Sequence, residues 1–182
     1  MNLGELGDLL ENSTNILRVE TLSRYTSASD RDWVAAYLHG EQKPDVEAKR
    51  EWLDILSGHA AAGHPVRRVR VVQRPVSDYV RYSCEWSYVD NAAAGEQVRV
   101  LDEDDDDPDA ADLAHLVGDF YVADDRVITM RYDADGAFVS AEVVADRAGR
   151  MRAQAERAFA RGRDFTEWWA ANPQLHRSLV AH

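Results

Sequence analysis

Hydrophobic and polar positions alternate along several short segments of the chain, the pattern expected of β-strands that place one face on a core. The clearest is 66–73, which is rich in valine. In 16–21, Leu17 and Val19 alternate with Arg18 and Glu20. The remaining segments predicted to form strands are 97–101, 119–122, 126–132 and 137–144.

Between these segments, apolar residues recur at steps of three and four, which favours amphipathic helices. The best defined helix begins at Ser77, a good N-cap, and ends near Ala94. Residues 1–14 are expected to form an N-terminal helical arm, and 147–162 another helix. The predicted inner stripe of the helix that Ser77 caps consists of Tyr79, Tyr82, Trp86, Val89 and Ala93.

The order of these elements predicts the topology. A strand, a helix and a strand follow one another directly over 66–101, which favours a right-handed crossover between parallel strands. The last three strand segments are joined by short turns, one of them an Asp-Gly pair at 135–136, which indicates an antiparallel meander. We therefore expect an α+β fold: a mixed sheet of about five strands with helices packed over it.

Length and composition predict that the chain forms a single domain. The chain has 182 residues, of which 45% are hydrophobic, enough for a single core. It contains no stretch of 18 apolar residues, so no membrane span is expected. A lone cysteine, Cys84, and a beginning without the features of a signal peptide favour a cytoplasmic location. The tail, 173–182, is expected to fray.

The net charge of −12 is unevenly distributed, because the stretch 102–112 holds eight acids and no base. Like charges this dense repel one another and predict a mobile loop. The body of the chain is only mildly acidic, but it lacks the basic surface that grips phosphates, so no direct contact with nucleic acid is expected. The candidate partner-binding residues of this loop are Asp104, Asp105, Asp106 and Asp107.

Motifs for metal, cofactor and catalytic chemistry are missing from the sequence. The acidic stretch begins with the spacing of a calcium loop, but Asp107 stands where that loop needs glycine and Leu113 where it needs glutamate. The six histidines are scattered, and one cysteine cannot build a zinc site. The glycine-rich phosphate loops and the nucleophile elbow are also absent. We expect no metal, no cofactor and no catalytic residue.

Arginines within strands are the unusual feature of the sequence. If the strands are neighbours, one face of the sheet carries Arg18, Arg68, Arg70 and Arg99, with Glu20 among them. Such a face can form an anion pocket, because the guanidinium group presents a rigid fork of donors. The alternative is cross-strand charge pairing on a partly exposed face.

Four segments together also suggest a relationship: LRVETLSRY at 17–25, VRRVRVVQRPVSDYVRY at 66–82, AAAGEQVRVL at 92–101 and DFYVADD at 119–125. With this set, residues 15–165 resemble an uncharacterised actinobacterial family of single-domain proteins, often encoded beside helix-turn-helix regulators. The final part also looks distantly like half of a phospholipase-D-like unit, without its His-x-Lys-x-x-x-x-Asp motif. This second resemblance implies kinship of fold only.

Three functions follow, in order of preference. The first is a non-enzymatic regulatory protein that binds a protein partner, namely a helix-turn-helix regulator, as the resemblance implies. Its acidic loop would cover the partner's basic surface. The second is a sensor of a small anionic ligand that uses the arginine face. The third is a phosphodiesterase-like hydrolase.

Overall fold

A mixed β-sheet forms the centre of the protein in the computed structural model, which describes residues 1–28, 30–115 and 118–177. Within these residues the sheet has seven strands in the order β6-β5-β4-β1-β2-β3-β7, more than the five or so expected. The strands are β1 (Ile16–Glu20), β2 (Val66–Val72), β3 (Gln97–Asp102), β4 (Asp119–Ala123), β5 (Arg126–Tyr132), β6 (Phe138–Val144) and β7 (Arg163–Asp164).

The topology agrees with the predicted crossover and meander. Strands β1, β2 and β3 are parallel, with the helical crossover between β2 and β3. Strands β4, β5 and β6 form the antiparallel meander, and β4 joins it to β1. The strand that the sequence did not reveal is β7, which has two residues and pairs antiparallel with β3. The expectation of an α+β fold is confirmed.

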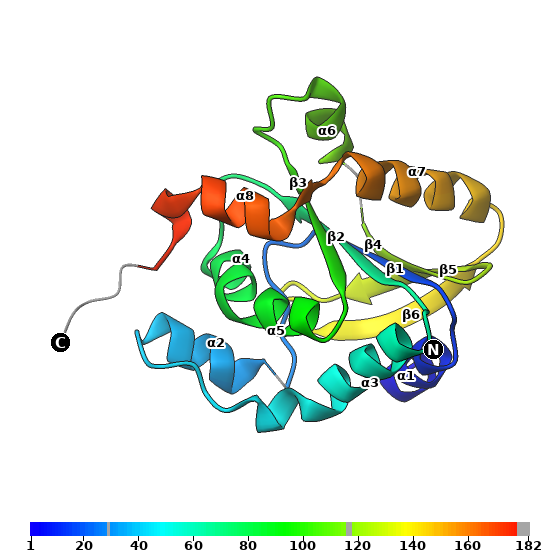
Figure 1. Cartoon of the computed structure of the whole chain (residues 1–182). Helices are drawn as coiled ribbons and strands as arrows, with labels where there is room; N and C mark the ends of the chain where they lie inside the picture. Colours follow the sequence, from blue (N-terminus) through cyan, green and yellow to red (C-terminus); the bar gives the residue numbers. More distant parts are fainter. Residues whose placement is uncertain (29, 116–117, 178–182) are drawn as a thin grey trace.

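Helices cover both faces of the sheet (Figure 1). One face carries α6 (Pro108–Leu113) and α7 (Ala148–Arg161). On the other face lie α1 (Leu3–Glu11), α3 (Arg50–Ala61), a continuous helix made of α4 (Asp78–Tyr82), η2 (Ser83–Ser87) and α5 (Tyr88–Ala93), and α8 (Phe165–Ala171). Outside this layer, α2 (Arg31–Leu38) packs on α4 and η2. The short 3-10 segments are η1 (Val46–Lys49) and η3 (Pro173–Leu175).

Because side chains alternate along the strands, the two faces of the sheet carry different residues: apolar ones on one face and several charged ones on the other. Leu17 and Val19 of β1 and Val69 of β2 point toward α7 and are fully buried. Each such side chain stabilises the fold by about 1.5–3 kcal/mol. The residues between them, among them Arg18, Glu20 and Arg68, therefore point to the face that α3 and the α4–η2–α5 helix cover.

The α4–η2–α5 helix begins as predicted, because the side chain of Ser77 accepts a hydrogen bond from the backbone N–H of Val80. Its predicted stripe is wrong in its second half. The helix is buried on two sides: Tyr82 and Trp86 pack with α2, whereas Cys84 and Tyr88 pack with the sheet. Val89 is therefore 47% exposed. The middle of the helix is a π-helical turn, Ser83–Ser87, a feature that often accompanies functional sites.

The segments expected to be irregular contain some regular structure. The acidic stretch 102–112 includes the end of β3 and most of α6. In the C-terminal stretch 173–182, η3 forms and Leu175 packs beside α8, while 178–182 lie outside the described residues. Across 1–28, 30–115 and 118–177, no helix has the length and apolar character needed to cross a bilayer.

Candidate anion-binding cleft

The strand register brings four of the five predicted face residues together. Arg18 lies opposite Arg68, and Glu20 lies opposite Arg70, in the parallel pair of β1 and β2. Arg99 does not join them, and this part of the prediction is wrong. In the next parallel pair Arg99 is opposite Val69, so its side chain points to the α7 face, with its guanidinium 5.7 Å from the centre of the Phe159 ring.

Glu20 is the centre of an ion-pair cluster on this face. One oxygen of its carboxylate lies 2.9 Å from Arg18 Nη2 and 2.6 Å from Arg68 Nη1. The other oxygen accepts a hydrogen bond from the Tyr88 hydroxyl at 2.9 Å and lies 4.0 Å from Arg70 Nη1. Burial alone would raise the pKa of Glu20, but the three guanidinium groups outweigh it and hold that pKa well below its usual range.

A second carboxylate completes the cluster. Glu96, just before β3, lies 2.8 Å from Arg68 Nη2 and accepts a hydrogen bond from the Asn91 side chain at 2.7 Å. Glu20, Arg68 and Glu96 are all buried. Cross-strand charge pairing, the alternative to an anion pocket, is therefore present, but of the paired residues only Arg18 is partly exposed. The face is an interior face with paired charges.

Arg70 is the residue of this cluster whose charge is not matched. It is fully buried, and its Nη2 donates to the backbone carbonyl of Leu22. Its Nε and Nη1 have no hydrogen-bond partner among the described residues. Arg18, Arg68 and Arg70 thus stand against Glu20 and Glu96, which is an excess of one positive charge within these five residues, and the carboxylate of Asp119 interacts with Arg18 from outside them.

A cleft of about 690 Å³ lies between this face and the helices α1, α3 and α4–η2–α5. Its volume is in the range of small-molecule sites. Arg18 is the arginine of the cluster that a ligand can reach, because its side chain is 20% exposed, against 7% for Arg68 and 1% for Arg70. Its guanidinium lies 5.1 Å from the centre of the Tyr121 ring and 5.5 Å from that of Tyr25.

Several residues that line the cleft carry aromatic rings. Such rings favour a flat or apolar ligand and also hold a guanidinium group in place. The Tyr132 hydroxyl is 3.5 Å from Arg18 Nη2. The ring-bearing residues that line the cleft include Tyr25, Trp52, Tyr79, Tyr121, Tyr132 and Phe138.

The helical wall contains a buried lysine that the sequence analysis missed. Lys49 Nζ lies 2.6 Å from Asp30 Oδ1, 2.7 Å from the Tyr82 hydroxyl and 3.3 Å from Ser87 Oγ. Burial would raise the pKa of Asp30, but Lys49 outweighs it and lowers that pKa. The chain has two lysines, so their rarity was the one available signal.

A polar contact on the opposite wall fixes Tyr25. Its hydroxyl donates to Asp119 at the start of β4, and the hydroxyl of Thr21 donates to the same carboxylate at 2.9 Å. Burial raises the pKa of Asp119. These bonds attach the segment that follows β1 to the meander, so the Tyr25 ring stays against Arg18.

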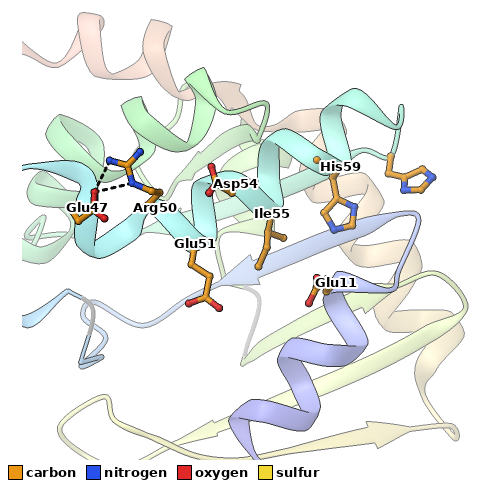
Figure 2. A pocket seen from close by; sticks show the side chains of 9 residues that line it. Glu11, Glu47, Arg50, Glu51, Asp54, Ile55 and His59 are labelled. Atoms are coloured by element: carbon orange, nitrogen blue, oxygen red, sulfur yellow. Dashed lines mark hydrogen bonds and ion pairs between the residues drawn. The ribbon is translucent and has the colours of Figure 1, made fainter.

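A second hollow, of about 780 Å³, lies between α1 and α3 (Figure 2). Its side chains do not converge: Glu51 and Asp54 leave α3 in different directions, and Arg50 turns to Glu47, to which it is hydrogen-bonded. No group of three or more His, Cys, Asp or Glu side chains in the described part of the chain is arranged to hold a metal ion. The arginine-lined cleft is therefore the better candidate for a site.

The acidic residues proposed for partner binding are partly engaged within the molecule. Asp104 lies 3.1 Å from Arg74, and Asp107 lies 3.3 Å from Arg161. Asp105 accepts a hydrogen bond from the backbone N–H of Asp107. Within the described residues Asp106 makes no ion pair. Intramolecular bases thus neutralise part of the charge that the partner hypothesis requires.

Comparison with known proteins identifies the family. The chain belongs to a family described as a domain of unknown function (DUF6879), whose model matches residues 5–170. This agrees with the resemblance to an uncharacterised family. No curated protein matches the chain.

Among solved structures, the chain is similar to TrmBL2, an archaeal chromatin protein whose structure is described as showing a novel mode of DNA binding. The two share 12% identity, with a TM-score of 0.42 over 92% of this chain and 48% of that one. The chain thus spans about half the length of that protein. A likeness at this level carries no argument about the activity of the present chain.

This likeness nevertheless corrects one prediction. We expected no direct contact with nucleic acid because the body of the chain outside 102–112 is mildly acidic and lacks a basic surface. The structural neighbour is described as DNA-binding, so this exclusion is withdrawn. The charge of the body alone does not decide whether a chain contacts nucleic acid, because net charge does not describe how bases are distributed over a surface.

Proposed function

We propose that this protein binds a small anionic molecule in the arginine-lined cleft and acts as its sensor. One observation carries the proposal: Arg18 reaches a cleft of about 690 Å³ while its guanidinium is held from behind by Glu20 and flanked by two tyrosine rings. A donor group held in one orientation binds an anion with little further loss of conformational entropy.

Charge pairing alone accounts for only part of this arrangement. Glu20 and Glu96 neutralise Arg68 through contacts of 2.6 and 2.8 Å. Arg18 Nη2 forms an ion pair with Glu20 and donates to the Tyr132 hydroxyl, whereas no hydrogen bond of its Nε or Nη1 is found in the described chain. Because Arg18 lines the cleft and keeps these donors, an anion can bind there without displacing Glu20 from its other partners.

The test is a comparison of two arginine variants in a thermal-shift experiment. Arg18→Gln keeps a hydrogen-bonding side chain beside Glu20 but removes the charge at the cleft. Arg99→Gln removes the same charge from the α7 face of the same sheet and is the matched control. The anions used are 3-phenylpropionate, salicylate, adenosine monophosphate and glucose 6-phosphate.

We expect at least one of these anions to raise the Tm of the wild type and of Arg99→Gln, but not of Arg18→Gln. At a ligand concentration of 100 Kd the stabilisation is about 2.7 kcal/mol, which corresponds to a rise in Tm of about 5–10 °C for a chain of this size. Circular dichroism shows whether each variant is folded. An equal shift in Arg18→Gln and the wild type contradicts the proposal.

The partner role implied by the resemblance stays a prediction, as does the hydrolase. The contacts in the described residues support a ligand-binding role of the cleft better than the partner role or the hydrolase. Two of the four aspartates assigned to a protein partner already pair with Arg74 and Arg161. For the hydrolase, the His-x-Lys-x-x-x-x-Asp motif of a phospholipase-D-like site is missing from the sequence.

A further inference from the structure

We infer that the ligand of the cleft is a monocarboxylate with an aromatic or branched apolar body, rather than a phosphate ester. This inference rests on the proposed function and names the class of molecule that the cleft would take. Three features carry it: the size of the charge excess, the number of donors within reach, and the character of the walls.

The charge excess matches a ligand with one negative charge. Arg18, Arg68 and Arg70 face Glu20 and Glu96, which leaves one positive charge unmatched within this cluster, while Glu51 on the cleft wall and Asp119 near Arg18 bring further negative charge to the region. A single carboxylate beside Arg18 would neutralise it. The second charge of a phosphate monoester would have no cation of its own, and it would lie near the Glu20 carboxylate, itself 2.9 Å from Arg18 Nη2. That charge would be repelled, and the low-polarity surroundings would strengthen the repulsion.

The donors within reach also fit a carboxylate. Arg18 presents one fork, which suits a two-oxygen group. The other cations that line the cleft are Arg68 and Lys49. Arg68 is paired with Glu20 and Glu96, and the three N–H bonds of Lys49 are already directed to Asp30, Tyr82 and Ser87. Lys49 therefore has no donor left for the further oxygens of a phosphate group. The hydroxyl of Tyr88, which also lines the cleft, is engaged with Glu20.

The walls indicate the rest of the molecule. A cleft of about 690 Å³ is far larger than a carboxylate group. Beside its charged residues, the cleft is lined by rings and apolar side chains, with Trp52, Met130 and Phe138 among them. An aromatic or branched apolar body fills such a space and buries its surface against these side chains. Free acetate or inorganic phosphate would leave most of the cleft empty.

The experiment uses three molecules with the same phenyl body and different charge: 3-phenylpropionate, 3-phenylpropanamide and 2-phenylethyl phosphate. Acetate and inorganic phosphate report binding by the charged group alone. Affinities are measured by calorimetry at pH 7.5 with the wild type, Arg18→Gln, Arg18→Lys and Arg99→Gln. Arg18→Lys keeps the charge but lacks the fork, and it also serves if Arg18→Gln does not fold.

We expect 3-phenylpropionate to bind the wild type at least tenfold more tightly than the amide, the phosphate or acetate. Arg99→Gln keeps this preference, Arg18→Lys reduces it and Arg18→Gln loses it. Tighter binding of 2-phenylethyl phosphate, lost in Arg18→Gln, overturns the carboxylate inference and leaves the anion site standing. Equal binding of acid and amide with no effect of Arg18→Gln, or no binding of any probe at 10 mM, overturns the anion site as well.

Discussion

Replacement of Glu20 by glutamine is expected to lower the free energy of unfolding by about 3–5 kcal/mol, the usual effect of removing one member of a buried ion-pair group. Glu20 is 4% exposed and is shared by Arg18, Arg68 and Arg70. Without its charge Arg70 has no acidic side chain within ion-pair distance among the described residues. Three guanidinium groups would then repel one another in the interior.

Urea unfolding measures this effect, and Glu11→Gln is the control because Glu11 is an exposed carboxylate on α1. The control is expected to change stability by less than about 0.5 kcal/mol. A loss of less than 1 kcal/mol in Glu20→Gln would mean that the charge of Glu20 does not organise this face. The loss should appear as a shift in the urea midpoint at constant slope.

The same carboxylate predicts how stability depends on pH. The arginines hold the pKa of folded Glu20 below the value of 4.5 that applies to an unperturbed glutamate. The unfolded chain therefore binds more protons than the folded chain as pH falls below that value. The contribution of Glu20 is complete above about pH 5 and is lost progressively in more acid solution. The difference between wild type and Glu20→Gln should thus be constant at neutral pH and shrink below about pH 4.5.

Arg70→Met is expected to have the opposite effect on stability. The Nε and Nη1 groups of Arg70 are buried without a hydrogen-bond partner, and its distance to Glu20 is 4.0 Å. A buried guanidinium group whose donors lack partners carries a desolvation cost that an apolar side chain does not. Glu20 keeps its closer partners Arg18 and Arg68 in this variant. The free energy of unfolding should therefore stay the same or rise.

The same substitution should weaken binding of 3-phenylpropionate, because it removes the excess positive charge behind the cleft. For charges about 10 Å apart at an effective dielectric constant of about 20, the loss is about 1.7 kcal/mol, or roughly tenfold in Kd. Arg131→Met, which removes an exposed arginine from β5, is the control for both measurements. A variant that is as unstable as Glu20→Gln would show instead that Arg70 is a structural partner of Glu20.

Together these two effects explain why a poorly satisfied arginine would stand in the core. Such a buried charge lowers the stability of the fold and strengthens ligand binding, a combination that is common at binding sites. On this account the fold is stabilised mainly by its apolar clusters, and Arg70 is retained for the potential that it creates in the cleft.

Much of the sheet was predictable because strand alternation is a local signal. Apolar and charged residues alternate over 17–20 in β1 and over 68–71 in β2, so the face shared by Arg18, Glu20, Arg68 and Arg70 could be predicted. The face of the sheet on which Arg99 lies could not be predicted from the sequence. It depends on the register between β2 and β3, and a shift of one residue moves a side chain to the other face. Strand β7 has two residues and is too short to show a pattern.

The cleft was less predictable than the arginines on its floor. Its other walls come from segments far apart in the sequence, and Tyr25 meets Asp119 across 94 positions. Lys49 lies in a segment with no recognisable motif, and its contacts with Asp30 and Tyr82 exist only because α2, η1 and α4 converge. The second half of the stripe on the α4–η2–α5 helix failed because two layers bury that helix, whereas a single-face pattern assumes one.

The most direct test of the anion cleft is an NMR titration that observes the arginine side chains. The Nε–H signal of Arg18 is assigned by its absence from the spectrum of Arg18→Gln and followed while 3-phenylpropionate is added. Anion binding in the cleft predicts a saturable shift of the Arg18 signal, with the Arg99 signal on the opposite face unchanged. A spectrum in which Arg18 does not respond, or responds no more than Arg99, would contradict the assignment of this cleft as an anion-binding site.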